Sequence, residues 1–274
     1  MEDEKEVALL PVYFKKKGEL KFSFHPSITP YNSPQFIRPE KIADARWEKN
    51  KFYILETLEE FVKSNYVYPY FFLDVNLVDV RPFTWNSWQV NPAFTFLVVP
   101  SEAKLDSDIS RRSRNCLKDG YKVSFDWNPQ VFIDLFGMTM ERQKIEVSYK
   151  KSEMLKFLND LKDSGIAWMC STFDSNGNAH ACWVQLQSRD SVVYNWNSAT
   201  NLSFENSGGT SLLVDQLLNK LIAEKVLVWD LCGADNQSVV GFKSKLGGVL
   251  KSYFKAAFNR YSIKKKIYFR WMNR

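Results

Sequence analysis

The spacing of apolar and polar residues divides the first part of the chain into short strands and one long helix. Residues 7–14 (VALLPVYF) and 20–24 (LKFSF) are apolar runs typical of strands, and the KKKG between them predicts a charged turn. From Glu40 to Ser64, apolar side chains recur at steps of three and four residues, which predicts a helix. Strands are also expected at residues 68–75 and 93–99, with loops rich in proline or aromatic residues at 27–36 and 79–92.

From residue 106 onward, helical and strand-like patterns alternate. Asn128 is the expected N-cap of a helix with Pro129 at its first position, and Gly120 is expected just after the end of the preceding helix. Helices are predicted at residues 106–119, 128–143, 152–163, 208–225 and 236–246, and strands at residues 121–125, 166–173, 179–187, 191–199, 226–231 and 250–258. The pattern predicts an α/β (α+β) protein with mixed sheets flanked by helices, in two domains at residues 1–105 and 106–274.

Composition indicates a folded chain whose charge is unevenly distributed. The 274 residues are 45% hydrophobic and 15% aromatic, which excludes a disordered protein. No apolar run approaches the roughly 20 residues needed to cross a bilayer, and the acidic start MEDEKEVALL does not resemble a secretory signal. The formal net charge is +6, yet residues 251–274 hold eight cations and no acid, which leaves 29 cations against 31 acids elsewhere. This favours a local anion-attracting end over a nucleic-acid binder that uses the whole surface.

The cysteines and histidines predict neither a disulfide framework nor a metal site. The four cysteines are widely spaced and form no CxxC pair, so we expect free thiols in a reducing cytoplasm. The two histidines, His25 and His180, have no other histidine or cysteine at metal-ligand spacing. We therefore expect no metal ion to take part in the chemistry.

Five stretches of the chain are distinctive in their order. They are LPVYFKKKG (10–18), ITPYNSP (28–34), RPFTWNSW (81–88), SRRSRNCLKDGYKV (110–123) and WDLCGADNQSVVGFKSKLGG (229–248). Together they resemble the Fem-like branch of the GNAT-fold acyltransferases, which contains the peptidoglycan-bridge aminoacyltransferases and their bacterial acetyltransferase-like relatives. The resemblance implies two GNAT-like domains. It also implies that the first is truncated at its N-terminus, because the branch has a further helix and strand upstream.

The resemblance implies an enzyme of bacterial cell-envelope biogenesis in the cytoplasm. Its expected activity is that of an N-acyltransferase, such as an N-acetyltransferase. It would move an acyl group from acetyl-CoA or another acyl-CoA to an amine of an envelope sugar or peptide precursor, which in this family is often linked to a lipid or a nucleotide. One alternative is an aminoacyltransferase that uses charged tRNA, which is disfavoured because no long helical-hairpin arm is seen. The other is a non-catalytic GNAT-like protein that binds an anionic glycan or a membrane.

Two residues are candidates for catalysis. The resemblance places the Phe242–Lys243 pair at the active cleft, where Lys243 would stabilise negative charge and Phe242 would contact the substrate. The alternative interpretation is that Lys243 and Lys245 are solvated helix charges. Tyr194 is a candidate proton donor on the predicted strand 191–199. Trp196 has the same parity on that strand, so both side chains would face the cleft and Trp196 would contact substrate.

A second group of residues is expected to bind anions. Ser207, Gly208, Gly209 and Thr210 begin a predicted helix directly after a strand, where free N–H groups and the helix dipole favour a coenzyme pyrophosphate. A helix N-terminus without a ligand is the alternative. Arg111 and Arg114 share one face of the predicted helix 106–119 and would grip a phosphate, whereas Arg112 would point away; a solvated helix face is the alternative.

The remaining candidates concern the acceptor and the membrane. Tyr31 and Trp85 lie on the two predicted loops of the first domain and would line an acceptor cleft, with buried packing as the alternative. The tail IKKKIYFRWMNR mixes cations with aromatic and aliphatic residues, which suits contact with the inner face of an anionic membrane. Its alternative is a final strand with a solvated basic face.

Overall fold

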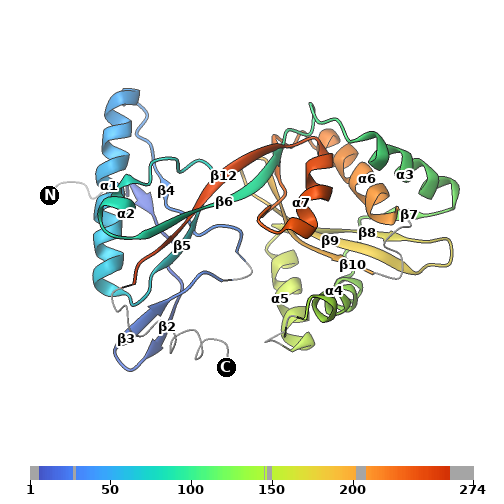
Figure 1. Cartoon of the computed structure of the whole chain (residues 1–274), viewed down its shortest axis with the longest axis horizontal. Helices are drawn as coiled ribbons and strands as arrows, with labels where there is room; N and C mark the ends of the chain where they lie inside the picture. The colour runs from blue at the N-terminus through green and yellow to red at the C-terminus, as the bar shows by residue number, and fades with distance from the viewer. Residues whose placement is uncertain (1–5, 27–28, 145, 147–149, 202–207, 260–274) are drawn as a thin grey trace. The chain divides into compact units, whose positions relative to one another are not determined.

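The computed structural model describes residues 6–26, 29–144, 146, 150–201 and 208–259 (Figure 1). The first compact unit holds the described residues up to Phe94 and again from Ser252 onward, and the second holds Thr95–Lys251. The sequence predicts a single boundary after residue 105. In the structure, the chain passes into the second unit within the strand at residues 89–98 and returns to the first within the strand at residues 249–257. The chain returns because its last strand pairs with a strand far away in the sequence, and the spacing of apolar residues does not predict such a pairing.

The first unit is built from short antiparallel pairs and one long helix. β1 (Ala8–Leu9) pairs with β4 (Gln35–Phe36), β2 (Phe14–Lys17) pairs with β3 (Leu20–Ser23), and β5 (Tyr70–Leu73) pairs with β12 (Val249–Ala257). Helices α1 (Asp44–Asn65) and α2 (Arg81–Trp85) belong to this unit, as does the start of β6 (Gln89–Val98). Its core combines α1, α2 and the strands through Leu55, Val62, Phe71, Leu73, Phe83, Trp88 and Ala256.

Three predictions for the first unit were wrong. The single strand predicted at residues 7–14 is divided into β1 and β2 around Pro11, because proline has no N–H with which to continue a strand ladder. The lysines predicted as a turn are strand residues of β2, and Gly18, at φ +59°, follows them in the actual turn. The predicted loop at 79–92 contains helix α2, with Pro82 in its first turn, and the first residues of β6.

The second unit is a mixed sheet with helices on both faces. Its strands run in the order β6, β11 (Val228–Asp230), β10 (Val192–Thr200), β9 (Ala179–Gln187), β8 (Ala167–Phe173) and β7 (Lys122–Ser124). β11 is antiparallel to β6, and β9 and β8 are antiparallel to their neighbours, whereas β10 and β11 are parallel. The helices are α3 (Ser107–Lys118), α4 (Pro129–Gln143), α5 (Lys151–Asp163), α6 (Gly209–Ala223) and α7 (Gln237–Lys243), the last extended by a 3₁₀ turn at Ser244–Leu246.

Helices cover both faces of this sheet (Figure 1), and each face has its own core. On one face, the buried leucines of α6 pack with Val193, Trp183 and Trp229 of the sheet. On the other face, Phe132 of α4 and Leu158 of α5 pack with strand residues that include Met169, Val184 and Ala199. The mixed α/β fold class predicted from the sequence is therefore confirmed.

Local signals placed the helix ends correctly. The side-chain oxygen of Asn128 accepts a hydrogen bond from the N–H of Val131 at 3.3 Å, and Pro129 is the first residue of α4. Gly120, at φ +80°, follows the C-cap of α3. Among the described residues, no helix has both the length and the apolar character needed to cross a lipid bilayer.

The parallel strands β10 and β11 stay together over only three residues each. Val192–Tyr194 pair with Val228–Asp230, after which β11 ends and β10 continues to Thr200. The pairing of β10 with β9 shifts register between Asn195 and Asn197, which marks a bulge at Trp196. β10 therefore has β9 on one side and no strand partner on the other beyond Tyr194, among the residues described.

Candidate functional site

A pocket of about 450 Å³ lies at the point where β10 and β11 separate. The strands supply Trp183 of β9, Asn195, Ser198 and Thr200 of β10, and Leu231 just after β11. The remaining wall comes from the ends of α3, α4 and α6 and from α7 with its 3₁₀ turn. The sheet is open here because a strand that outlasts its parallel neighbour leaves a gap that side chains fill only in part.

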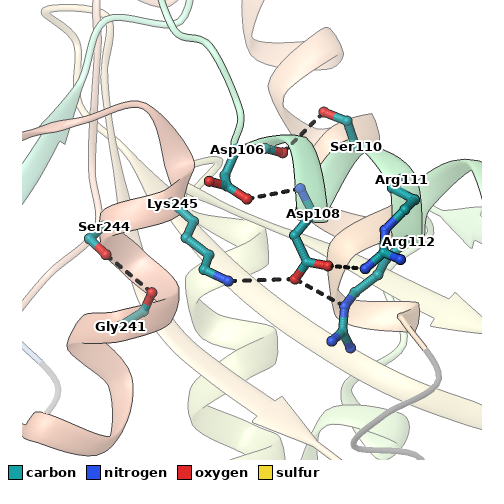
Figure 2. A network of polar contacts seen from close by, with 8 residues as sticks. All are labelled: Asp106, Asp108, Ser110, Arg111, Arg112, Gly241, Ser244 and Lys245. Atoms are coloured by element: carbon teal, nitrogen blue, oxygen red, sulfur yellow. Dashed lines mark hydrogen bonds and ion pairs between the residues drawn. The ribbon is translucent and has the colours of Figure 1, made fainter.

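Positive charge is in excess around the pocket. Four cations, Arg112, Arg142, Lys243 and Lys245, and one acid, Asp108, line it. Figure 2 shows that Asp108 lies between Arg111, Arg112 and Lys245, at 2.5, 3.2 and 3.5 Å from their nearest nitrogens. The hydrogen bond from Arg111, together with those from Arg112 and Lys245, lowers the pKa of Asp108 to about 2. The carboxylate is therefore ionised at neutral pH and offsets one of the four charges.

The start of α6 forms another part of the wall. Gly208 and Thr210 line the pocket, together with Ser211. A Cβ at Gly208, which has φ +84°, would come within 3.1 Å of Arg112 Cβ and Cys116 Sγ on α3. A Cβ at Gly209 would come within 3.0 Å of His180 Nδ1. The two glycines thus let α6 pack closely against its neighbours, and its first turn opens on the pocket. Ser207, predicted to share this role, lies outside the described residues.

Lys243 lines the pocket, but its ammonium group is fully engaged by the protein. Its Nζ donates to the backbone carbonyls of Leu231, Cys232 and Gly233 at 2.7, 2.9 and 2.6 Å. An ammonium group has three protons, so all three are used. Burial lowers the pKa of Lys243, and its electrostatic interactions with Cys232 and Asp230 oppose that shift. The role predicted for Lys243, a donor to an oxyanion, stays a prediction and would require one of these bonds to be released.

The turn that Lys243 holds is also fixed from within. The buried Asp230 accepts hydrogen bonds from the Thr95 hydroxyl at 2.5 Å and from the N–H of Cys232 at 2.8 Å. Cys232 has φ +50° and Gly233 has φ +80°, so this turn departs from extended backbone directly after β11. Burial raises the pKa of the Cys232 thiol well above its usual value. The end of β11 is therefore a pinned turn with an unreactive cysteine.

Phe242 is the other predicted residue that the pocket brings together with Lys243. It lines the pocket, and its ring meets the Trp183 ring edge-on with centroids 6.4 Å apart. Tyr194 and Trp196, the other pair of predicted residues in this unit, are not among the pocket residues. Trp196 packs with Phe132 of α4 and Phe157 of α5, because it alternates with Val193 and Asn195 and so faces the other core.

The arginine of α3 that lines the pocket is not one of the two predicted to bind phosphate. Arg111 is exposed and paired with Asp108, and Arg114 is exposed without lining the pocket. Arg112, expected to point away, is the arginine of α3 that lines it. In the first unit, Tyr31 meets the Tyr253 ring at 5.3 Å, and Trp85 is exposed beside Phe52 and the Arg81 guanidinium.

Sequence reasoning missed most residues of the pocket, among them Arg142, Lys245, Thr139, Asn195 and Ser198. Arg142 and Lys245 come from helix ends that are distant in sequence, and neither belongs to a recognisable motif. Asn195 and Ser198 carried a weak signal, since three polar residues interrupt an otherwise apolar strand. That interruption marks the bulge, where a strand can expose polar groups to a cavity.

Neither reactive thiols nor a metal cluster is found at the site. Burial raises the pKa of Cys116 and of Cys182 to about 11, and the described cysteines are free. Within the described ranges, no three His, Cys, Asp or Glu side chains are grouped in a way that could hold a metal ion.

Comparison with known proteins identifies the fold. No protein-family model matches the sequence, and no curated protein matches it either. The crystal structure of FemX superposes with a TM-score of 0.68 and 11% identity, covering 100% of this chain and 89% of that one. The structure of L-PGS from Bacillus licheniformis gives a TM-score of 0.61 and 11% identity, covering 96% of this chain and 84% of that one.

A third structure is informative about domain number. The tandem GNAT protein from the clavulanic acid biosynthesis pathway gives a TM-score of 0.51 and 9% identity, covering 91% of this chain and 78% of that one. At these identities the comparisons establish the fold, and they confirm the resemblance seen in the five sequence stretches at that level. The chain has the Fem-like GNAT fold, with two GNAT-like domains.

Proposed function

We propose that this protein transfers an acyl group from a coenzyme A thioester, such as acetyl-CoA, to an amine of a cell-envelope sugar or peptide precursor. The observation that carries the proposal is the cation-rich pocket at the separation of β10 and β11, in a protein with a Fem-like GNAT fold. An acyl-CoA has phosphate groups and a thioester with a polar carbonyl, and both suit such a pocket. The cations and the start of α6 would bind the phosphates, and the strand-lined part would hold the acyl group.

The phosphates of the donor would lie against the cations and the start of α6. Arg112 and Arg142 offer planar guanidinium groups that can bond two phosphate oxygens at once, and Lys245 adds a point charge. The first-turn N–H groups of α6, at Gly208, Gly209 and Thr210, add the favourable end of a 15-residue helix dipole. Among the described residues, Arg142 forms no ion pair, so its charge is available to a ligand.

The acyl group would lie in the strand-lined part of the pocket. A neutral amine attacks the thioester carbonyl, the N–C bond forms, the C–S bond breaks, and the proton lost by the amine goes to the thiolate or to solvent. The protein's contribution is to hold the two reactants together and to place donors around the developing oxyanion. Tyr194 as proton donor and Lys243 as oxyanion donor remain proposals. Lys243 also positions the turn after β11 through its three carbonyl contacts.

The proposed acceptor is an amine of an envelope precursor. Support for an envelope precursor comes from the sequence stretches that resemble the peptidoglycan-bridge branch and from the fold shared with FemX and L-PGS. The acceptor contacts that the sequence predicts for Tyr31, Trp85 and Trp196 stay proposals, and the ring of Trp196 packs against Phe132 and Phe157. The basic tail predicted to contact a membrane lies outside the described residues.

Calorimetric titration of the purified chain with acetyl-CoA, and with coenzyme A alone, tests the donor. Saturable binding of acetyl-CoA that weakens as salt is raised is expected, because the pocket is cationic. Absence of binding at millimolar acetyl-CoA would contradict the proposal. Competition by uncharged tRNA would then indicate a tRNA-borne donor, and salt-sensitive binding of an anionic glycan alone would indicate a non-catalytic binding protein.

A further inference from the structure

A chain of hydrogen bonds between buried side chains crosses the sheet and ends in the pocket. The indole N–H of Trp229 donates to Gln185 Oε1 at 3.1 Å, and Gln185 Nε2 donates to Asn195 Oδ1 at 2.7 Å. Asn195 Nδ2 then donates to Ser198 Oγ at 3.0 Å. Trp229, Gln185 and Asn195 are buried, whereas Ser198 is half-buried and lines the pocket.

The direction of this chain is fixed by its first member. An indole nitrogen can only donate, so the amide oxygen of Gln185 must face Trp229 and its NH₂ must face Asn195. The same reasoning turns the oxygen of Asn195 toward Gln185 and its NH₂ toward Ser198. Ser198 must therefore accept with its oxygen, and its own hydrogen has to point elsewhere.

The pocket is the direction left for that hydrogen. No hydrogen bond donated by the Ser198 hydroxyl is found among the described residues, and its backbone N–H is already bonded to Asn197 Oδ1 at 2.9 Å. We propose that Ser198 is the hydrogen-bond donor to the carbonyl oxygen of the acyl group, held in that role by Trp229, Gln185 and Asn195. This inference rests on the proposed acyl-transfer function and names a residue for it.

Trp183 supports the assignment from the neighbouring strand. It is the register partner of Ser198 across the β9–β10 pair, so the two side chains share a face of the sheet. Trp183 also lines the pocket, is 4% exposed, and has an indole N–H that is buried without a hydrogen-bond partner among the described residues. A buried donor without a partner is costly, which favours an acceptor supplied by a ligand on this face.

The chemistry requires a donor of this kind. When the amine attacks, negative charge builds on the carbonyl oxygen, and a donor already aimed at that oxygen stabilises it without reorganisation. Hydrogen bonds in a chain polarise one another, so the hydroxyl of Ser198 donates more strongly than an isolated serine. Ser198 would be a catalytic residue in this scheme, and Gln185 and Asn195 would be positioning residues.

The test uses acetyl-CoA labelled with ¹³C at the carbonyl, bound to the full chain and observed by isotope-edited infrared spectroscopy. A hydrogen bond to the carbonyl lowers its stretching frequency, and this readout needs no acceptor substrate. In the wild-type complex we expect a band below that of free acetyl-CoA. In Ser198→Ala we expect the shift to be reduced or lost, with Kd raised by no more than about tenfold, because one neutral hydrogen bond is removed.

A second variant tests the positioning residues while Ser198 stays in place. In Asn195→Asp, both carboxylate oxygens can only accept, so the Ser198 hydroxyl turns to donate to the aspartate instead of the pocket. The carbonyl shift should then fall as it does in Ser198→Ala. Ser171→Ala, at a buried serine of β8 that does not line the pocket, is the matched control and should keep the wild-type shift.

The outcomes separate this inference from the proposed function. Failure of the wild-type chain to bind acetyl-CoA overturns the donor and the Ser198 assignment together. Saturable binding with an unshifted wild-type carbonyl, or with the same shift in Ser198→Ala, overturns only the Ser198 assignment. A shift lost in Ser198→Ala and retained in Asn195→Asp overturns the positioning by the amide chain. If Asn195→Asp does not fold, the Ser198→Ala result still decides the assignment.

Discussion

The two units each contain a cavity, and the larger cavity is not the better candidate site. The first unit has a cavity of about 900 Å³ among α1, α2 and the loops beside them, whereas the pocket of the second unit is about 450 Å³. In the larger cavity, three cations (Arg38, Lys51 and Arg81) face three acids (Glu48, Asp74 and Asp79). Each cation is paired: Arg38 with Asp44, Lys51 with Glu48 at 2.7 Å, and Arg81 with Asp79 at 2.7 Å.

The polar networks of the two units differ in the same way. In the first unit, the buried Asn32 bonds to the backbone of Tyr70 and Phe72 and to His25, so its polar groups serve the fold. In the second unit, the amide chain ends on the Ser198 hydroxyl in the wall of a pocket with excess positive charge. Cavity size therefore says little about function here. Unbalanced charge and a polar network that ends at a cavity are the distinguishing features.

The largest expected effect concerns Lys243, which lines the pocket and also holds the fold. In Lys243→Met, three backbone carbonyls lose their shared charged donor, so the free energy of unfolding should fall by about 2–3 kcal/mol. Urea unfolding measures this, with Lys245→Met as control. Among the described residues, the Lys245 ammonium has one ion pair, at 3.5 Å to Asp108, and losing it should lower the free energy of unfolding by less than about 1 kcal/mol. Unchanged stability in Lys243→Met, together with slower acyl transfer, would instead favour the oxyanion role predicted from the sequence.

A smaller effect would test the contrast between the two cavities directly. Arg142→Ala removes a pocket cation without an ion pair among the described residues, and should raise the Kd for acetyl-CoA by about tenfold. Arg81→Ala removes a cation of the other cavity that is already neutralised by Asp79, and should leave that Kd unchanged. Calorimetry on the two variants measures both. Equal losses would contradict the view that charge balance separates the two cavities.

The smallest effect uses the two histidines, one in each unit, as reporters of pH. Burial lowers the pKa of His25, and burial also lowers the pKa of His180 against the opposing charge of Asp174. As pH falls below 6.5, the unfolded chain binds protons that the folded chain does not, so the free energy of unfolding decreases until the lowered folded pKa values are passed. Imidazole NMR titration should place both transitions below 6.5. The urea midpoint of unfolding should be lower at about pH 5 than at about pH 7.5.

Most helices and strands of this protein could be predicted because their signals are local, whereas the short helix α2 was predicted as a loop. The stripe of leucines in α6, the Asn128–Pro129 start of α4 and the glycine after α3 depend on neighbours within a few residues. The first strands were less predictable, because Pro11 divides a run that hydrophobicity alone shows as continuous. The return of the chain to the first unit through β12 depends on pairing with β5, far away in the sequence.

The sequence by itself determined the fold class, the Fem-like resemblance and the excess of positive charge at the chain's end. Only the tertiary structure decided that the Lys243 ammonium donates its three hydrogen bonds to backbone carbonyls and that Arg112 and Arg142 line the pocket. It also decided that Trp196 is packed between helices and that Ser198 ends a directed chain of hydrogen bonds. The reason is physical. A residue's type sets what it can donate or accept, whereas its partners are set by which distant segments the sheet and its bulge bring within 3 Å or so of it.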